Sequence, residues 1–207
     1  MIAGLLLAAG GSRRFKSQKL VARHRGVALV EHAAMRLRAA TDRVIVVVGH
    51  DAEAVRGALT GLDVQIVENP EWERGLSTSI RRGVEAMPGD AEALVVAVGD
   101  QPGLDPGVTQ SVIARWRETG LPIVGASYRG TRGHPVLFAR AVFAELIELQ
   151  GDAGARLLIE RSPGRVSYVE VDAEMPPDVD TTEQLAALEA PSSATPSAGA
   201  QRRREEQ

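Results

Sequence analysis

An apolar run near the start of the chain leads directly into two glycines and a group of cations. Residues 2–9 (IAGLLLAA) are predicted to form a buried strand, because the run is short, apolar and bounded by small residues. Gly10 and Gly11 lack a Cβ, so the backbone there can take a positive φ and approach a ligand closely. Consecutive N–H groups in such a turn form a concave anion site. The segment that follows adds the cations Arg13, Arg14, Lys16 and Lys19. The stretch predicts a polyphosphate site; the alternative is a glycine turn with a solvated basic edge.

Two well-known phosphate-binding motifs are absent from the sequence. It contains neither the GxxxxGK[ST] loop nor the GxGxxG dinucleotide fingerprint. The lack of the second motif disfavours an NAD-binding Rossmann protein, which stays open as one alternative.

Strands alternate with helices along the chain, which indicates an α/β fold. The expected strands have apolar rather than alternating patterns, and this is typical of a parallel sheet covered by helices on both faces. We therefore expect a three-layer α/β/α, Rossmann-like fold with a mostly parallel sheet. The expected strands are residues 2–9, 43–48, 64–67, 93–98, 123–126, 135–138 and 166–171. The expected helices are residues 27–40, 51–59, 76–87, 105–118, 141–149, 153–160 and 181–188.

Two finer expectations concern helix starts and one loop. Asp51 and Asp105 have the position and side chain of helix N-caps, and Pro106 suits a first helical position. A polar loop is expected over residues 128–134, between two short strands.

Residues 1–190 are expected to form one domain, since a chain of 207 residues buries a single core comfortably. Residues 191–207 (PSSATPSAGAQRRREEQ) lack apolar side chains able to anchor them, so this segment is expected to be a disordered tail.

The composition excludes several classes of function. The chain has no cysteine, which excludes disulfides, thiolate metal sites and cysteine nucleophiles. Its net charge is −3, with acids and bases mixed, so it offers no basic face for nucleic acid. The apolar runs are far shorter than the ~20 residues of a membrane span, and the first strand is not preceded by a signal peptide pattern. We expect a cytoplasmic protein that binds neither nucleic acid nor membrane.

Two carboxylates fall where ligands bind in such a fold, at the carboxyl ends of strands. Asp100 follows one apolar strand, and Asp180 lies after the last. Carboxylates near a triphosphate are the usual way to hold Mg²⁺, which takes only one or two protein oxygens. The alternatives are a turn role for Asp100 and a helix start at Asp180, where Thr181 and Gln184 have the spacing of a capping box.

Three segments resemble the MobA-like nucleotidyltransferases. Residues 7–19 (LAAGGSRRFKSQK) resemble the family signature LAxGxSxRxxxxK. GDQP at 99–102 resembles the metal-binding GDxP segment, and DVDT at 178–181 resembles a second acidic segment. The matches occur in the family's order and are spread over most of the chain.

This resemblance implies a nucleotidyltransferase fold and a set of site residues. Arg14, Lys19 and Asp100 would be catalytic, and Asp100 and Asp180 would hold Mg²⁺. The implied nucleotide-binding residues are Leu7, Ala8, Ala9, Gly10, Gly11, Ser12, Arg14, Lys19, Gly75, Ser79 and Asp100.

Further segments are similar to those of family members that transfer CMP to the molybdenum cofactor. These are NPEW at 69–72, RGHPVLF at 132–138 and GDAGAR at 151–156. Ala9 stands where guanylyl-transferring relatives usually have glycine, which favours CTP. The resemblance implies transfer of CMP from CTP to the phosphate of molybdenum-molybdopterin, with release of pyrophosphate, and a molybdenum hydroxylase or its chaperone as a partner. The implied acceptor-binding residues are Gln101, Pro102, Arg132, Gly133, His134 and Pro135.

The chain departs from the family pattern in two places. VAL at 27–29 replaces a glycine-lysine-proline-leucine sequence, and Thr182 and Gln184 are atypical of the last acidic segment. Two alternatives therefore stay open: a MobA-like transferase with another nucleotide or phosphorylated acceptor, and a molybdenum cofactor-binding chaperone with little turnover. Trp72 could either pack under the loop or form part of the nucleotide pocket. His134 could either belong to a loop without a binding role or lie over the acceptor pocket.

Overall fold

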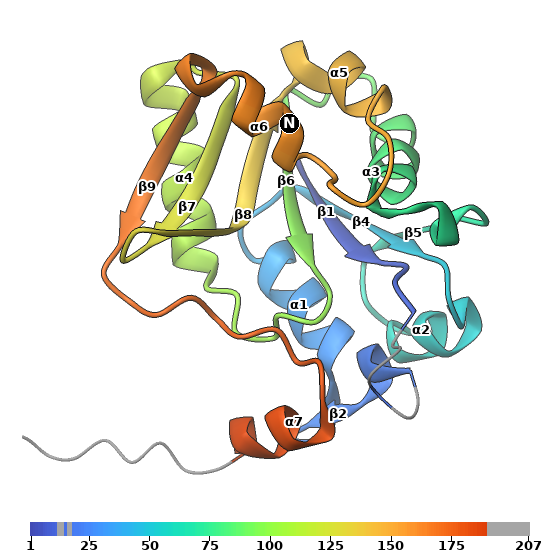
Figure 1. Ribbon diagram of the computed structural model, residues 1–207. Helices are drawn as coiled ribbons and strands as arrows, with labels where there is room; N and C mark the ends of the chain where they lie inside the picture. The colour runs from blue at the N-terminus through green and yellow to red at the C-terminus, as the bar shows by residue number, and fades with distance from the viewer. Residues whose placement is uncertain (12–14, 16–17, 190–207) are drawn as a thin grey trace, which may run out of the picture.

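The computed structural model describes residues 1–11, 15 and 18–189, and within them a seven-stranded sheet lies between two layers of helices (Figure 1). The strands of this sheet are β1 (Ile2–Ala8), β4 (Arg43–Val48), β5 (Gln65–Glu68), β6 (Ala93–Val98), β7 (Ile123–Tyr128), β8 (Thr131–Ala139) and β9 (Val166–Val171). The helices are α1 (Leu29–Arg38), α2 (Ala52–Ala58), α3 (Leu76–Glu85), α4 (Pro106–Thr119), α5 (Phe143–Ile147), α6 (Arg156–Arg161) and α7 (Thr182–Glu189). Short 3-10 turns are η1 (Lys19–Val21), η2 (Trp72–Arg74), η3 (Arg140–Val142) and η4 (Pro163–Arg165).

The strand order in the sheet is β5-β4-β1-β6-β8-β7-β9. Strands β5, β4, β1 and β6 are parallel neighbours, and β9 is parallel to β7. Within the described sheet, β8 alone is antiparallel to its two neighbours, β6 and β7. The expected three-layer α/β/α fold with a mostly parallel sheet is confirmed.

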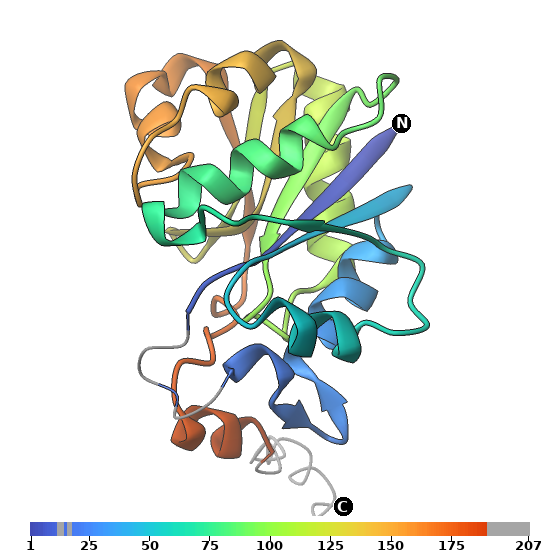
Figure 2. The ribbon, with the colours of Figure 1, turned by 90° about the vertical axis from the view of Figure 1, so that its right-hand side faces the viewer.

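Side chains of β1 enter two separate cores, one on each face of the sheet. Leu6 belongs to the core beneath α1 and α4, whereas Leu5 and Leu7 belong to the core beneath α3, α5 and α6. Figure 2 looks onto the side that carries α3. Because both faces are covered, every position of β1 is buried, and this explains why the strand is an unbroken apolar run.

The prediction of a loop over residues 128–134 is wrong, because the structure has a tight hairpin there. Tyr128 pairs with Thr131, so the turn consists of Arg129 and Gly130 alone. Both take a positive φ, 47° and 85°, as a two-residue hairpin of type I′ requires. The first residues of β8 are polar and gave no strand signal. His134 therefore lies in a strand.

Two expectations about helix starts are also corrected. The helix expected from residue 27 begins at Leu29, because β3 (Val27–Ala28) pairs with β2 (Arg23–His24) in a small hairpin. Asp51 precedes α2 but makes no capping hydrogen bond through its side chain. The cap expected at Asp105 is confirmed: its Oδ1 accepts a hydrogen bond from the N–H of Gly107 at 2.8 Å.

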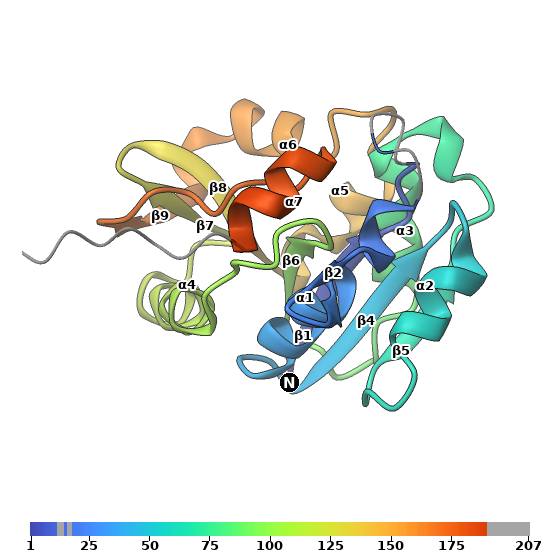
Figure 3. The ribbon, with the colours of Figure 1, turned by 90° about the horizontal axis from the view of Figure 1, so that it is seen from below.

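After β9 the chain crosses the carboxyl ends of the strands to reach α7; we call residues 172–181 the C-terminal strap (Figure 1). α7 then lies beside β2, on the side seen in Figure 3. Val179 of the strap is buried with Phe15 and Leu29 in a small apolar cluster, which Leu185 and Leu188 of α7 flank. This cluster fixes the strap against the edge where β1 and β6 end.

Candidate active site

Two loops that follow neighbouring parallel strands form the centre of the site. β1 continues into Gly10 and Gly11, and β6 continues into Gly99 and Asp100. The N–H of Gly99 donates a hydrogen bond to the carbonyl of Leu7 at 3.0 Å, so the ladder between the strands extends to the loops. Gly10, Gly11 and Asp100 therefore share one edge of the sheet, and neither glycine takes a positive φ. We call Gly10 and Gly11 the glycine turn.

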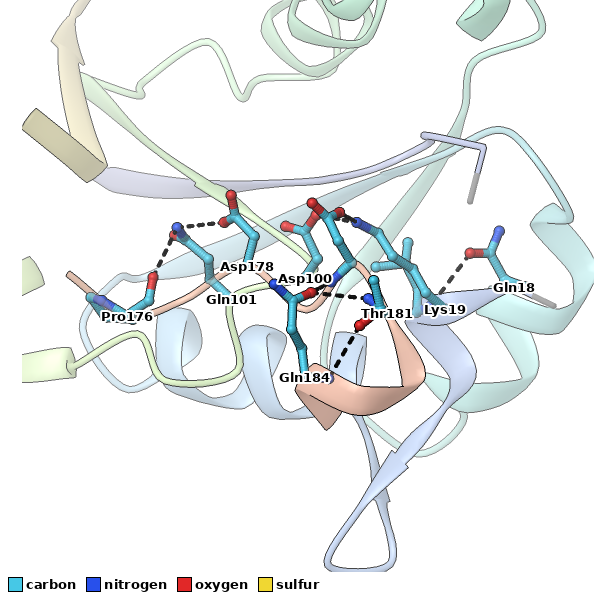
Figure 4. A network of polar contacts seen from close by, with 10 residues as sticks. Gln18, Lys19, Asp100, Gln101, Pro176, Asp178, Thr181 and Gln184 are labelled. Atoms are coloured by element: carbon cyan, nitrogen blue, oxygen red, sulfur yellow. Dashed lines mark hydrogen bonds and ion pairs between the residues drawn. The ribbon is translucent and has the colours of Figure 1, made fainter. Parts of the chain in front are cut away.

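The ammonium of Lys19 joins two carboxylates at this edge. Its Nζ lies 2.6 Å from Oδ2 of Asp100 (Figure 4). The same Nζ lies 2.8 Å from Oδ1 of Asp180. The Lys19 side chain is only 14% exposed. Burial by itself lowers the pKa of Lys19, but the hydrogen bonds and negative charges of the two aspartates outweigh it and raise that pKa. Lys19 therefore stays charged at neutral pH.

The C-terminal strap is tied to the Asp100 loop by backbone and side chain. The N–H of Val179 donates to the carbonyl of Asp100 at 3.0 Å. The side-chain amide of Gln101 donates to Oδ1 of Asp178 at 2.8 Å and to the carbonyl of Pro176 at 3.4 Å (Figure 4). Gln101, which was expected to bind the acceptor, is buried and has its amide in this tie.

Asp178 is a third carboxylate near the centre, to which the sequence assigned no role. Burial, and next the charge of Asp100, raises the pKa of Asp178, while the hydrogen bond from Gln101 opposes this effect. Its position two residues before Asp180 was the one available signal, and it does not indicate which way the side chain points.

The start of α7 explains why the carboxylate of Asp180 reaches Lys19. Oε1 of Gln184 accepts hydrogen bonds from the N–H groups of Asp180 at 2.7 Å and Thr181 at 3.0 Å. The N–H of Gln184 in turn donates to Oγ1 of Thr181 at 3.2 Å. Thr181 and Gln184 thus form the capping box that their spacing predicted. Because they cap the helix, the side chain of Asp180 can pair with Lys19.

A cleft of about 430 Å³ opens above the glycine turn. Every expected nucleotide-binding residue that the structure describes lines it, whereas Ser12 and Arg14 lie outside the described residues. The expected residues on its wall are Leu7, Ala8, Ala9, Gly10, Gly11, Lys19, Gly75, Ser79 and Asp100. The additional lining residues are Leu20, Trp72, Glu73, Leu76, Val98 and Asp152.

Trp72 combines the two roles that the sequence left open. It lines the cleft, and its ring also packs against the glycine turn, where a Cβ on Gly11 would lie 3.1 Å from the ring. The imidazole of His50 meets the ring edge-on at 5.1 Å between centroids. Trp72 therefore supports the loop and forms part of the cleft wall.

A second cavity of about 310 Å³ lies next to the cleft and shares Leu7 and Leu76 with it. Its wall is mainly apolar, with side chains from β7, β8, α3 and α6. Of the expected acceptor-binding residues, Arg132, Gly133 and His134 line it. Pro135, Gln101 and Pro102 are buried and do not line this cavity.

His134 and Arg132 contribute to the polar part of this cavity, together with the ion pair of Arg156 and Glu160 at 3.1 Å. Nδ1 of His134 lies 3.4 Å from the carbonyl of Val96, and burial lowers the pKa of the imidazole despite that contact. The guanidinium of Arg132 lies 4.8 Å above the ring of Tyr168. The cavity thus combines an apolar wall, a neutral imidazole and a cation at its edge.

The paired carboxylates suit a hard divalent cation. Both reach one ammonium, so their oxygens converge on one position. Mg²⁺ and Mn²⁺ prefer such oxygens and take their other ligands from water or phosphate. Among the described residues no group of three or more His, Asp or Glu side chains could hold a metal ion, so Asp100 and Asp180 would need those additional ligands.

Two glycines, a lysine and paired carboxylates at one edge of a Rossmann-like sheet are the groups that a nucleotidyltransferase needs. Residues 4–166 match the MobA-like NTP transferase domain, and the chain belongs to that family. The family and the fold predicted from the sequence are both confirmed.

Similar proteins cover nearly the whole chain. Nicotine blue oxidoreductase from Paenarthrobacter nicotinovorans is 30% identical over 193 residues, which cover 89% of this chain and 94% of that protein. Rv0371c from Mycobacterium tuberculosis H37Rv is 31% identical with a TM-score of 0.80, covering 91% of this chain and 97% of that one. A structure of Rv0371c in complex with manganese is similar at a TM-score of 0.77 and 29% identity, covering 90% of this chain and 97% of that one.

A nucleotidyl transferase from Methanothermobacter thermautotroptrophicus is also similar, with 25% identity and a TM-score of 0.77 over 91% of this chain and 96% of that one. In the part of the chain that the structure describes, no helix has the length and apolar character needed to span a bilayer.

Proposed function

We propose that this protein transfers CMP from CTP to the terminal phosphate of a molybdopterin-type acceptor and releases pyrophosphate. The observation that carries the proposal is the cluster of Lys19, Asp100 and Asp180 beside a nucleotide-sized cleft that adjoins an apolar cavity. Family membership supports nucleotidyl transfer. The choice of CTP and of the acceptor rests on Ala9 and on the segments at 132–138 and 151–156.

In this proposal the protein acts by positioning and by neutralising charge, without a covalent intermediate. Asp100 and Asp180 would hold Mg²⁺, which would supply positive charge to offset the charge of the phosphates. Lys19, once the carboxylates are otherwise neutralised, turns to the β- and γ-phosphates and stabilises the leaving pyrophosphate. The N–H groups of the glycine turn cradle the phosphates, and Arg14 is proposed to share this work with Lys19.

The bond changes in this reaction need no general base from the protein. An ionised oxygen of the acceptor phosphate attacks the α-phosphorus of CTP, and the bond to the bridging oxygen of pyrophosphate breaks. The attacking oxygen carries no proton at neutral pH. The catalytic contribution of the chain is therefore geometry and charge.

The apolar cavity is the proposed place for the ring system of the acceptor. Its shared wall with the cleft, Leu7 and Leu76, would put the acceptor next to the nucleotide. Arg132 at its edge provides a cation for an anionic group of the acceptor, and Nε2 of the neutral His134 can accept one hydrogen bond when Nδ1 donates to Val96.

Pyrophosphate release with CTP, Mg²⁺ and purified molybdopterin acceptor tests the proposal. Asp100→Asn should abolish turnover and leave the melting temperature within a few degrees of wild type. Asp90→Asn, the same change at an exposed turn outside the cleft, is the matched control. Normal turnover by Asp100→Asn would remove Asp100 from the metal site. A preference for GTP over CTP would refute the cytidylyl assignment and leave nucleotidyl transfer standing.

Similarity to nicotine blue oxidoreductase supports a second candidate, an oxidoreductase built on the same scaffold. The apolar cavity could then hold the substrate to be reduced or oxidised. An NAD(P)H oxidation assay with quinonoid dyes tests this candidate. Dye-dependent turnover that survives Asp100→Asn, together with no pyrophosphate release by wild type, would favour it.

Three further proposals follow from the sequence. Residues 1–190 form the catalytic domain and residues 191–207 a tail, supported by the change in composition after Ala190. The protein works in the cytoplasm, which fits its lack of cysteine. Its partner is a molybdenum hydroxylase or the chaperone of one.

A further inference from the structure

A loop far along the chain is docked onto the start of α3 at the cleft. Gly75 takes a φ of 111°, and a Cβ there would lie 2.6 Å from the carbonyl carbon of Gly151 and 2.8 Å from Oδ1 of Asp152. The N–H of Ser77 donates to the carbonyl of Gly151 at 3.1 Å. Only glycine permits so close an approach with this backbone conformation. The loop at 151–155 is therefore built to sit against Gly75.

Other contacts of α3 hold the residues just before this loop and Gly154 within it. The guanidinium of Arg81 donates to the carbonyls of Ile147 at 3.0 Å and Leu149 at 3.4 Å. Gly154 packs beneath the side chain of Leu76, with a φ of 52°. Held in this way, the loop presents Asp152 to the nucleotide cleft and Ala153 and Ala155 to the apolar cavity.

The carboxylates on the cleft wall differ in whether a neighbouring cation compensates their charge. Asp100 is partly compensated, because it shares the ammonium of Lys19 with Asp180. Asp152 and Glu73 are exposed, and neither forms an ion pair or hydrogen bond through its side chain with any described residue. An uncompensated carboxylate repels a triphosphate and accepts hydrogen bonds from neutral donors. The cleft therefore favours a nucleotide whose phosphates lie by Lys19 and whose nucleoside lies by Asp152.

We infer that Asp152 accepts hydrogen bonds from the nucleoside, either from ribose hydroxyls or from the amino group of the base. This inference rests on the proposed nucleotidyl transfer and assigns a role to the GDAGAR segment, which the proposed chemistry leaves without one. Asp152 suits this role better than Glu73, because its short side chain is held against Gly75 and loses less freedom on binding. Leu76, 39% exposed beside it, offers an apolar surface to the sugar or base.

Binding measured by fluorescence tests the inference without relying on turnover. The chain has two tryptophans, and Trp72 lines the cleft, so a Trp116→Phe background leaves one reporter. In that background, Asp152→Asn should bind CTP with Mg²⁺ about tenfold or more weakly, the effect of losing a hydrogen bond to a charged group. Inorganic tripolyphosphate should bind the variant no more weakly than the parent. Asp90→Asn should change neither affinity.

Other nucleotides identify the donor. If the ribose is the partner, Asp152→Asn weakens CTP and UTP alike and has much less effect on 2′-deoxy-CTP. If the amino group is the partner, the variant weakens CTP and leaves UTP unchanged. Asp152→Ala, which removes both oxygens, should weaken binding at least as much as Asp152→Asn.

Three results would overturn the inference. CTP affinity of Asp152→Asn equal to that of Asp90→Asn would show that Asp152 makes no nucleoside contact. An equal loss for tripolyphosphate would place its effect at the phosphates. If the parent binds CTP normally, either of these two results refutes the inference about Asp152 and leaves the proposed function standing. If the parent binds neither CTP, GTP nor UTP, the proposed function fails and the inference with it.

Discussion

Replacing Lys19 with methionine removes the ammonium that Asp100 and Asp180 share. The two contacts, 2.6 and 2.8 Å, join carboxylates that are only 22% and 25% exposed. Removing one partner of a buried ion pair costs about 3–5 kcal/mol, whereas an exposed pair contributes about 0–1 kcal/mol. Because water still reaches part of each carboxylate, we expect Lys19→Met to lower the free energy of unfolding by about 3 kcal/mol.

Urea unfolding followed by circular dichroism, with and without Mg²⁺, measures this loss. In Lys19→Met the carboxylates face each other without a cation, so Mg²⁺ should stabilise the variant more than wild type, where the ammonium competes. A cation at a hundred times its dissociation constant adds about 2.7 kcal/mol. The control is Arg115→Met, which breaks a pair with Glu118 whose side chains are 42% and 68% exposed.

Two outcomes would refute this reasoning. A stability of Lys19→Met equal to that of Arg115→Met would mean that the cluster is not a partly buried ion-pair network. A destabilised Lys19→Met that gains nothing from Mg²⁺ would mean that Asp100 and Asp180 do not hold a divalent cation together.

Further predictions concern packing, pH and the end of the chain. Gly83→Ala should destabilise the fold by about 1–3 kcal/mol in urea unfolding, because the new methyl group would collide with Leu5. Gly57→Ala, in a helix with open space around it, should stabilise by about 0.5–1 kcal/mol; equal effects at the two glycines would contradict the packing. Burial lowers the pKa of His134 in the folded protein from its usual value of 6.5. As the pH falls below 6.5, the unfolded chain therefore binds more protons than the folded one. Stability should therefore fall from pH 7 to pH 5, and fall less in His134→Gln; identical pH profiles would refute this. Ending the chain at Ala190 should leave the melting temperature and activity unchanged, and a loss of several degrees would show that residues 191–207 pack on the domain.

Much of the fold could be predicted because both faces of the sheet are covered. β4 and β6 match the expected bounds, since strands that pack on both sides read as continuous apolar runs. The bounds of β9, a half-buried edge strand, also match. β8 was only half predicted. At its start, Arg132 and His134 line a cavity, so polar residues replace the apolar pattern there.

The residues of the candidate site also fall into two groups, those that could be predicted from the sequence and those that could not. Lys19, Asp100 and Asp180 could be expected to meet, because each follows a strand or precedes a helix at the same edge of the sheet. Asp178 and Asp152 could not be assigned from sequence. Their positions depend on tertiary contacts, the tie to Gln101 and the docking against Gly75, that no local pattern encodes.

The C-terminal strap makes the timing of chain synthesis relevant to activity. Lys19 and Asp180 are separated by 161 positions in sequence, yet their side chains pair at 2.8 Å. At roughly 5–20 residues per second, a ribosome needs on the order of ten to thirty seconds to pass from one to the other. During that interval the glycine turn and Asp100 can be in place while the second carboxylate has not yet been made. A chain interrupted before the strap would retain most of its sheet and lack half of the proposed metal site, so incomplete products would not catalyse transfer.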